Sequence, residues 1–304
     1  MKIRIATRVS QLALLQSEWV KAQLIKQVPG VDVEMVGIKT QGDKLLDKKL
    51  NKIGGKGLFV KELEEAIYAG KADIAVHSCK DIPMELPQHM VIAAIFNRID
   101  PRDAFVSNQY TALGDLKQGA TIGTSSLRRQ AQLAALRPDL NFKMLRGNLI
   151  TRLEKLDSGE FDAIVLAVAG LQRLGLASRI SQYLEPEVLL PAVGQGALAI
   201  ECLNESKIKS LIMQLNEPLV AACVNAERAM NYCLKGSCQV PVAGFAQVSA
   251  EILYLRGLVA TPDGRQLLRA EQRGLISDGE KIGTAVGQEL LGLGADKILR
   301  SLAE

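Results

Sequence analysis

The sequence predicts an α/β protein with two similar domains, followed by a smaller α+β domain. Three observations lead to this fold class. Over most of the chain, short apolar or alternating segments typical of strands are interleaved with segments of helical spacing. This order predicts a mostly parallel sheet flanked by helices. The same order of motifs occurs twice, and the C-terminal part instead combines consecutive strands with a closing helix.

The first α/β pattern occupies the N-terminal part of the chain. We expect strands at 2–7, 31–40, 72–78 and 91–96, and helices at 11–28 and 58–69. Leu12, Leu15, Trp19 and Leu24 give the first helix its apolar face, and Pro29-Gly30 ends it. The segment 41–57 is polar and rich in Lys and Gly, and its length is typical of a mobile functional loop.

The pattern recurs after the first hundred residues. "AGKADIAV" and "SGEFDAIV" both lead through an aspartate into a strand, and "IATRVSQLA" and "IGTSSLRRQAQLA" both join a strand to a helix through hydroxyl residues and arginine. We therefore expect two similar hinged domains that form a cleft, with crossovers at 97–102 and 191–196. The predicted domains are 1–96 with 197–217, then 102–191, then 218–304.

The third domain is expected to start with a helix from 218 to about 234. Strands follow at 240–248, 251–259 and 266–273, and a closing helix spans 280–302. Cys238 lies in "GSCQVP", between residues that favour turns. A cysteine in a turn calls for a reason other than packing: a disulfide, a metal, a nucleophile or a point of attachment.

The composition argues against several classes of protein. The 304 residues are 48% apolar and carry a net charge of only +4, so the chain is not expected to coat nucleic acid, although one basic cleft is possible. Aromatic residues make up 4%, too few for stacking bases. The longest apolar run, 163–171, is too short to span a membrane. The N-terminal segment is not a secretory signal, so we expect a cytoplasmic protein.

The cysteines do not form an obvious framework. Their number, five, is odd and their spacing irregular, which argues against disulfides in a reducing compartment. No CxxC pair occurs and the histidines are only His77 and His89, so no metal site is predicted. A nucleophile or a point of attachment remains open for Cys238.

The clearest chemical signal is "TIGTSSLRRQ". Thr124, Ser125 and Ser126 occupy positions where a helix is capped, so free N–H groups and the helix dipole favour an anion there. The alternative is that one hydroxyl merely caps the helix. Arg128 and Arg129 favour the anion site, because cations in the first helical turn oppose the dipole unless an anion lies between them.

Further polar residues follow other predicted strands. Each arginine alone is best explained as a solvated surface residue, but the set indicates a ligand with several carboxylates or phosphates. The set comprises Arg8 with Ser10, Arg146 beside Gly147, Arg152 and Arg173. Lys80 and Asp81 end another strand, where α/β clefts open; a surface ion pair is the alternative. We expect His77 and Cys79 to be packing residues. "GGKGLFVKELE" does not match the spacing of a phosphate loop.

Six ordered motifs identify a family. "HSCKDIP", "GGKGLFVKELE", "IGTSSLRR", "LRGNLITRL", "VGQGALAIE" and "GSCQVPVAG" occur in the order found in porphobilinogen deaminases, also called hydroxymethylbilane synthases, and the resemblance covers essentially the whole chain. The departures are Gln11 in place of a common Pro, Cys79 in place of Met and Ser237 in place of Gly.

The resemblance implies both fold and activity. The expected fold is two α/β domains of the type II periplasmic-binding-protein kind, with a C-terminal α+β domain. The family is a transferase of tetrapyrrole and haem biosynthesis that joins four porphobilinogen molecules head to tail, releasing ammonia, into hydroxymethylbilane. It uses a dipyrromethane cofactor bound through a cysteine thioether, and each pyrrole ring carries an acetate and a propionate.

The resemblance also assigns residues. Cys238 matches the anchor of the cofactor and Asp81 the catalytic aspartate, which stabilises the cation left when ammonia departs. The implied cofactor-binding residues are Lys80, Asp81, Thr124, Ser125, Ser126, Arg128, Arg129, Arg146 and Gly147. The implied substrate-binding residues are Arg8, Ser10, Arg146, Arg152, Arg173 and Gln195. Lys52 and Lys56 fall in the predicted mobile lid. No metal, nucleic acid or membrane partner is implied, and a monomer is expected.

A second function class competes on the residues alone. A non-catalytic two-domain anion receptor would also use arginines and capping hydroxyls, but it needs neither Cys238 nor the Lys80–Asp81 pair and would usually be exported. An RNA-binding protein fits poorly, because the chain has few aromatic residues and little net charge.

Overall fold

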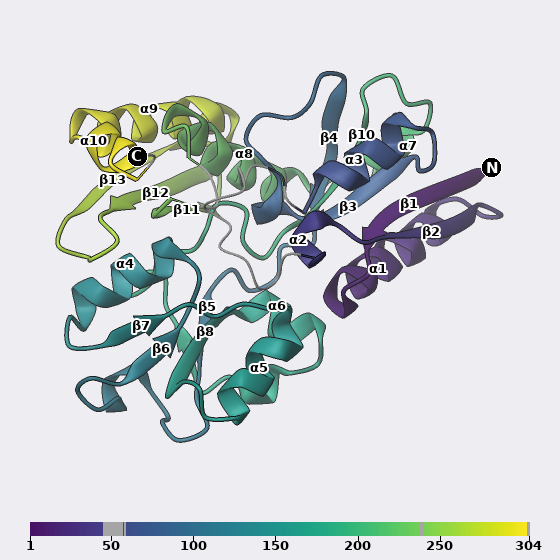
Figure 1. The fold of residues 1–304 in the computed structure, drawn as a ribbon. Coiled ribbons are helices and arrows are strands. Elements are labelled where there is room, and N and C mark those ends of the chain that lie inside the picture. The colour runs from purple at the N-terminus through teal and green to yellow at the C-terminus, as the bar shows by residue number, and fades with distance from the viewer. Residues whose placement is uncertain (45–56, 58, 237–239, 303–304) are drawn as a thin grey trace. The chain divides into compact units, whose positions relative to one another are not determined.

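The structure is a computed structural model and describes residues 1–44, 57, 59–236 and 240–302. The chain forms two compact units. The first contains residues 1–99 and 197–221, and the second contains 100–196 and 222–304. The elements are labelled in Figure 1. The predicted division into three domains stays a prediction.

The first unit is built on a five-stranded sheet in the order β2-β1-β3-β10-β4. Its elements are β1 (Lys2–Arg8), α1 (Gln11–Gln27), β2 (Asp32–Ile38), α2 (Gln41–Lys44), α3 (Lys61–Tyr68), β3 (Ile74–Ser78), the 3₁₀ turn Cys79–Asp81, β4 (Met90–Phe96), β10 (Leu198–Leu203) and α7 (Lys209–Met213). β10 is antiparallel to both β3 and β4, whereas β1, β2 and β3 are parallel.

Strand alternation decides which helix covers which face of this sheet. Ile3 and Ile5 of β1 pack in one cluster with Val20 and Leu24 of α1. Ala6, the next residue along β1, packs in another cluster, with Leu63 and Ile67 of α3. Successive side chains of a strand point to opposite faces, so α1 and α3 lie on opposite faces of the sheet.

The second unit contains a five-stranded sheet in the order β7-β6-β8-β5-β9. Its elements are β5 (Asp103–Val106), β6 (Thr121–Gly123), α4 (Leu127–Leu136), β7 (Asn141–Lys143), α5 (Leu149–Asp157), β8 (Ala163–Ala167), α6 (Val168–Arg173) and β9 (Gln182–Leu184). β5 is antiparallel to β8 and β9. Each five-stranded sheet therefore has one reversed strand, and it is the fourth strand in both: β10 in the first sheet and β5 in the second. Each of these strands begins just after the chain has passed from the other unit.

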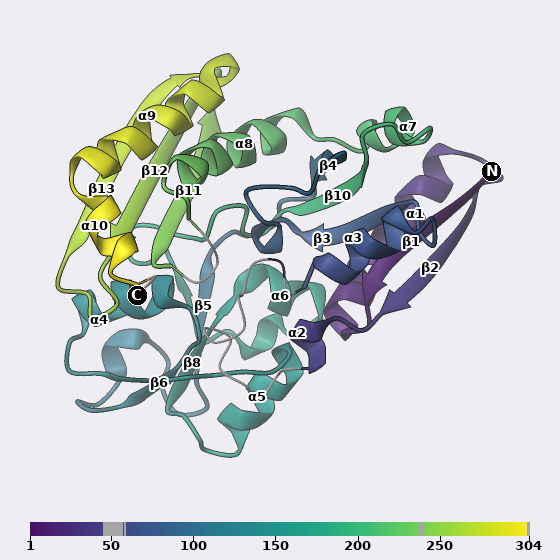
Figure 2. The same cartoon turned by 45° about the horizontal axis from the view of Figure 1, so that its top comes forward.

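The second unit also contains a three-stranded antiparallel sheet in the order β11-β12-β13. Its elements are α8 (Pro218–Cys233), which begins in the first unit, β11 (Val242–Ser249), β12 (Ile252–Ala260), β13 (Leu267–Leu275), α9 (Gly279–Gly292) and α10 (Ala295–Arg300). Met230, Val286 and Ile298 bring α8, α9 and α10 into one core with this sheet, and Figure 2 shows the helices along it.

The predicted fold class is confirmed: two α/β sheets of the same order and an α+β part at the C-terminal end. The single closing helix predicted at 280–302 is wrong, because α9 ends at Gly292 and α10 starts at Ala295. Gly294 between them has φ +99°, a left-handed conformation that glycine adopts without strain and that ends a helix.

Candidate functional site

The loop between β6 and α4 carries the strongest sequence signal, and all three hydroxyls in it have partners within the protein. Ser126 is the N-cap of α4 and its Oγ accepts from the N–H of Arg129 at 3.4 Å. Thr124 Oγ1 accepts from the N–H of Ser126 at 3.2 Å, and Ser125 Oγ donates to the carbonyl of Leu145. These bonds give the loop one defined conformation at the start of the helix.

Arg128 and Arg129 follow this cap and are both buried, with 4% and 6% of their surface exposed. They share one carboxylate, that of Asp103, which is completely buried at the start of β5. Arg129 Nη2 lies 2.7 Å from Asp103 Oδ1, and Arg128 Nη1 lies 2.8 Å from Asp103 Oδ2. The anion that offsets two cations at a helix N-terminus is thus supplied in part by the protein itself.

The charges of this cluster do not cancel. Burial alone would raise the pKa of Asp103, but the two arginines outweigh it and hold that pKa far below its ordinary value. Burial lowers the pKa of Arg128, against the pull of Asp103. Two guanidinium groups and one carboxylate leave one positive charge in a buried place, which favours a further anion.

Gln195 belongs to the same network. Its Nε2 donates to Asp103 Oδ1 at 3.0 Å and to the carbonyl of Pro101 at 2.7 Å. Pro101 and Gln195 lie close in sequence to the two points where the chain passes between units, after residue 99 and before residue 197. Gln195 therefore joins the segments at both passages and also bonds to Asp103, the residue that holds Arg128 and Arg129.

Arg146 and Gly147 precede α5. Gly147 has φ +114°, and a Cβ there would lie 2.7 Å from Thr151 Cγ2, so the position requires glycine. Asn148 caps α5 through Thr151 N–H at 3.0 Å, and Arg152 Nε donates to the Gly147 carbonyl at 2.9 Å. Arg146 and Arg152 thus extend from one short segment with a fixed backbone.

Arg173 ends α6. Its Nη2 donates to the carbonyl of Gly196 at 2.9 Å. Burial lowers the pKa of Arg173 to about 10, because a charged group loses hydration in the protein interior. A bound carboxylate would recover part of that lost solvation.

In the first unit, Arg8 ends β1 and Ser10 is the N-cap residue of α1, without a side-chain capping bond. Arg8 Nη2 lies 2.5 Å from Asp43 Oδ1, and the guanidinium lies 4.2 Å from the ring centroid of Phe59. Partial burial alone would raise the pKa of Asp43, but hydrogen bonds from Arg8 and Thr40 lower it. The ion pair with Asp43 and the contact with the Phe59 ring together hold the Arg8 side chain in one position.

Lys80 and Asp81 lie in the 3₁₀ turn that follows β3. The N–H of Cys79 donates to the carbonyl of Ala197 at 2.9 Å, and the N–H of Ile82 closes the turn on the Cys79 carbonyl at 3.2 Å. Cys79 is buried, while Lys80 and Asp81 are partly exposed. The turn places both charged side chains at the carboxyl end of a central strand, as predicted from the sequence.

His77 does more than pack. The buried His77 Nε2 lies 3.1 Å from Oε2 of Glu201, which is fully buried on β10. Glu64 of α3 is also buried, and burial, followed by Glu201 and Glu65, raises the pKa of Glu64 to about 7. Sequence reasoning passed over Glu201 and Glu64, and also Asp103 and Asp43. The signal for Asp103 was a charged residue at the start of the apolar strand "DAFV".

Three predicted residues lie outside the described part of the chain: Cys238, Lys52 and Lys56. Their predicted roles stay predictions.

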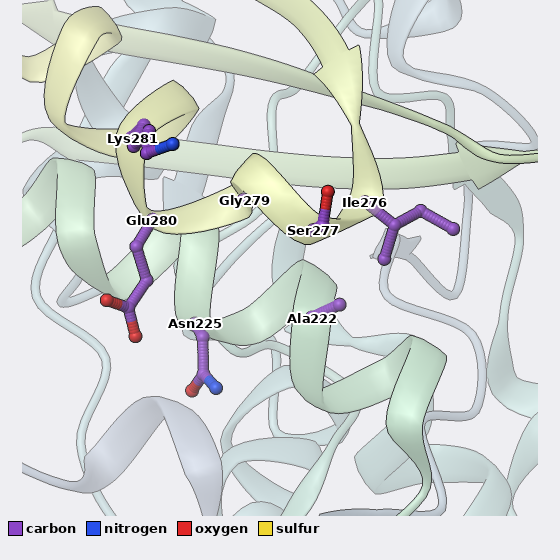
Figure 3. Close-up of a pocket in the computed structure, with 7 residues that line it drawn as sticks. All are labelled: Ala222, Asn225, Ile276, Ser277, Gly279, Glu280 and Lys281. Atoms are coloured by element: carbon purple, nitrogen blue, oxygen red, sulfur yellow. The ribbon is translucent and has the colours of Figure 1, made fainter.

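Neither of two cavities in the second unit is lined by any predicted site residue that the structure describes. One, of about 290 Å³, lies between α8 and α9, where Asn225 and Glu280 point to the same side (Figure 3). The other, of about 430 Å³, includes Asp100, Arg102 and Phe245. Arg102 in this second cavity forms ion pairs with Asp100 and Glu185 at 2.6 and 2.5 Å. Both of these carboxylates are therefore already paired with an arginine.

In the part of the chain that the structure describes, no helix combines the length and apolar character that crossing a bilayer demands.

Fold and site together define an α/β protein with buried and half-buried arginines at strand ends and helix starts. Comparison with known families identifies the family of this protein. Residues 3–210 match the model "Porphobilinogen deaminase, dipyromethane cofactor binding domain", and residues 221–292 match "Porphobilinogen deaminase, C-terminal domain". The chain belongs to the porphobilinogen deaminase family. It polymerises porphobilinogen in tetrapyrrole biosynthesis, as a hydroxymethylbilane synthase with a dipyrromethane cofactor.

Several solved structures are similar in part. The methionine-binding protein MetQ is 15% identical, with a TM-score of 0.45 over 70% of this chain and 89% of that one. Lipoprotein Tp32 from Treponema pallidum is 13% identical, with a TM-score of 0.46 over 76% of this chain and 95% of that one. The VFT2 domain of Bordetella pertussis BvgS is 16% identical, with a TM-score of 0.42 over 70% and 85%.

Proposed function

We propose that the dipyrromethane is attached through a thioether to Cys238 and that its carboxylates are bound by the buried arginines at the start of α4. The observation that supports this most directly is that, among the described residues, two buried arginines pair with only one buried carboxylate, Asp103. The acetate and propionate groups of a dipyrromethane are suitable partners for the remaining charge. Each charged hydrogen bond of this kind is worth about 1.5–3 kcal/mol.

The proposed cofactor-binding set combines arginines with short polar side chains. It comprises Lys80, Asp81, Thr124, Ser125, Ser126, Arg128, Arg129, Arg146 and Gly147. The hydroxyls fix the loop that leads into α4, and the guanidinium groups bind planar carboxylates in pairs. When bound, the dipyrromethane supplies the free pyrrole carbon to which porphobilinogen is joined.

The proposed substrate-binding set comprises Arg8, Ser10, Arg146, Arg152, Arg173 and Gln195. Arg173 supports the assignment best, because its burial and lowered pKa make a neighbouring carboxylate favourable. Arg152 and Arg8 are each held by fixed contacts, to Gly147 and to Asp43. Such contacts limit the entropy that these long side chains lose when they bind an anion.

Asp81 is proposed as the catalytic group. It lies beside Lys80 on a turn whose backbone is bonded to Ala197 at the start of β10. A carboxylate placed there stabilises the positive charge that develops on porphobilinogen when ammonia leaves, and it exchanges protons with pyrrole N–H groups. We further propose a lid that contains Lys52 and Lys56, the three-domain division given above, a cytoplasmic location and a monomer.

Intact mass spectrometry tests the anchor. The purified protein is expected to exceed its sequence mass by two pyrrole units, and Cys238→Ser is expected to lack that excess. Cys233→Ser is the matched control, because Cys233 lies five residues earlier on α8 and is partly buried against Thr284. Equal mass excess in both serine variants would refute attachment through Cys238.

The same measurement after addition of porphobilinogen tests Asp81. Wild-type protein is expected to show a ladder of masses, one step for each joined unit. Asp81→Asn is expected to keep the two-unit excess. It should add porphobilinogen units at least about a hundredfold more slowly than wild type, as is usual when an acid–base group is lost. Glu85→Gln changes an exposed carboxylate nearby and should add porphobilinogen units at the wild-type rate. A normal rate in Asp81→Asn removes this residue from the mechanism.

A further inference from the structure

A completely buried carboxylate lies behind the two arginines at the start of α4. From its contacts we infer that Asp103 is a positioning residue, which acts on the cofactor through Arg128 without touching it. The inference rests on the proposed function, in that these arginines bind the carboxylates of the dipyrromethane.

Arg129 is fixed at all three nitrogen atoms. Its Nε and Nη2 donate to Asp103 Oδ1 at 3.0 and 2.7 Å, and its Nη1 donates to the carbonyl of Val165 at 2.8 Å. The acceptors come from neighbouring strands, β5 and β8. Any rotation of the guanidinium would leave a buried charge without its partner, which is costly.

Arg128 is held at one corner only. Its Nη1 donates to the carbonyl of Leu190 at 2.7 Å and lies 2.8 Å from Asp103 Oδ2. The second contact is an ion pair without an aligned hydrogen bond, because Oδ2 accepts none within the described part of the chain. Nε and Nη2 of Arg128 make no hydrogen bond to any residue that the structure describes. Asp103 therefore fixes the direction of the guanidinium and leaves two of its nitrogen atoms for an anion.

The surroundings hold Asp103 and the carbonyl of Leu190 in turn. Gln195 donates to Asp103 Oδ1. Gln132 donates to the Leu190 carbonyl at 3.1 Å and accepts from the Leu190 N–H at 2.8 Å. Each member of the network is more than nine-tenths buried. Buried networks in which every member is bonded keep side chains in one geometry, as a site for a planar carboxylate needs.

A purely structural ion pair that joins α4 to β5 is the competing explanation, and a double-mutant cycle separates the two. The probe is porphobilinogen, and the readout is the concentration that loads half of the cofactor-free protein with its two-pyrrole mass. Asp103→Asn should raise this concentration about tenfold. Arg128→Gln should raise it by as much or more, and the double variant should match Arg128→Gln alone, because residues that act through one contact are not additive.

Asp139→Asn is the matched control. Asp139 pairs with Arg137 through two bonds of 2.7 Å just beyond the other end of α4. The substitution therefore removes an arginine–aspartate ion pair that does not involve Arg128. Its half-loading concentration should stay at the wild-type value. The inference is overturned if folded Asp103→Asn loads like wild type, or if the effects of Asp103→Asn and Arg128→Gln multiply in the double variant.

Asp103→Glu takes the place of Asp103→Asn if circular dichroism shows that the latter does not fold. It keeps the negative charge but moves the carboxylate relative to Arg128. A half-loading concentration raised several-fold, but not in the Arg128→Gln background, supports the inference; an unchanged value overturns it. Normal loading of Arg128→Gln itself would refute the proposed role of Arg128. Impaired loading of Arg128→Gln with normal loading of Asp103→Asn would refute only the role of Asp103.

Discussion

Asp103 and Glu64 are both buried carboxyl groups, and their neighbours move their pKa values in opposite directions. Asp103 has two guanidinium groups within 3 Å, and they lower its pKa far below the ordinary value despite burial. Glu64 has other carboxylates near it, and burial together with Glu201 and Glu65 raises its pKa to about 7. The identity of the nearest charge, more than burial itself, decides whether a buried acid is ionised.

Glu64→Gln is expected to stabilise the protein by an amount that grows as the pH rises from about 4.5 to 7. The pKa of Glu64 is near 4.5 when unfolded and about 7 when folded, so the folded state binds the proton more tightly. Its contribution to stability is complete below about pH 4.5 and is lost as pH rises through 7. Gln removes the charge, so the gain in unfolding free energy should be near zero at pH 4 and about 1–3 kcal/mol at pH 8.

Urea denaturation at the two pH values measures this gain. Glu18→Gln is the matched control, because Glu18 is an exposed carboxylate on α1 and is not among the groups that raise the pKa of Glu64. A gain of equal size at pH 4 and pH 8 would mean that the effect comes from packing and not from ionisation.

At the scale of single elements, caps decide where helices begin. Ser126 and Asn148 both occupy N-cap positions and accept from the N–H three residues later. Sequence reasoning placed hydroxyl residues at the first of these starts, because Ser and Thr before an apolar run are a local signal. It could not place the contact between Arg129 and Asp103, since those residues are far apart in sequence and meet only when β5 pairs with β8.

Asn148→Ala is expected to lower the unfolding free energy by about 1 kcal/mol, because the N–H of Thr151 loses its acceptor. Asn148→Asp should retain most of the stability, since a carboxylate also accepts this bond and interacts favourably with the helix dipole. Urea denaturation of the two variants gives both values. Equal losses in Ala and Asp would show that the side-chain cap is not what stabilises the start of α5.

The alternation of strands and helices was predictable because each strand and helix has its own periodicity. The exact place of β10 was not. "GALAIECL" reads as an apolar strand, but nothing local says that it lies between β3 and β4. The break between α9 and α10 was also missed, although Gly292 and Gly294 stand there, because a glycine inside a helical pattern does not always end the helix.

At the scale of the whole molecule, the first unit depends on a strand from a distant part of the sequence. β10 pairs with β3 on one side and β4 on the other, and Leu198, Ile200 and Cys202 are fully buried in its core. Removing β10 would therefore separate β4 from the sheet and leave a cavity in the core.

A fragment of residues 1–99 is expected to unfold without a cooperative transition, because it lacks β10. The same fragment joined by a short Gly-Ser linker to residues 197–221 contains all of the first unit and should unfold cooperatively. Circular dichroism during urea titration distinguishes the two. A sharp transition in the shorter fragment would show that the sheet does not need its inserted strand.

The position of β10 has a consequence for synthesis on the ribosome. β3 and β4 are made about a hundred residues before the strand that joins them, an interval of roughly 5–20 s at common elongation rates. During that interval the nascent chain carries two strands whose facing edges have no partner, and such edges attract other chains. The reversed strand of the second sheet, β5, is instead made before its neighbours β8 and β9. Residues 103–184 therefore complete a sheet from one continuous stretch, and we expect it to form on the ribosome before the sheet of the first unit does.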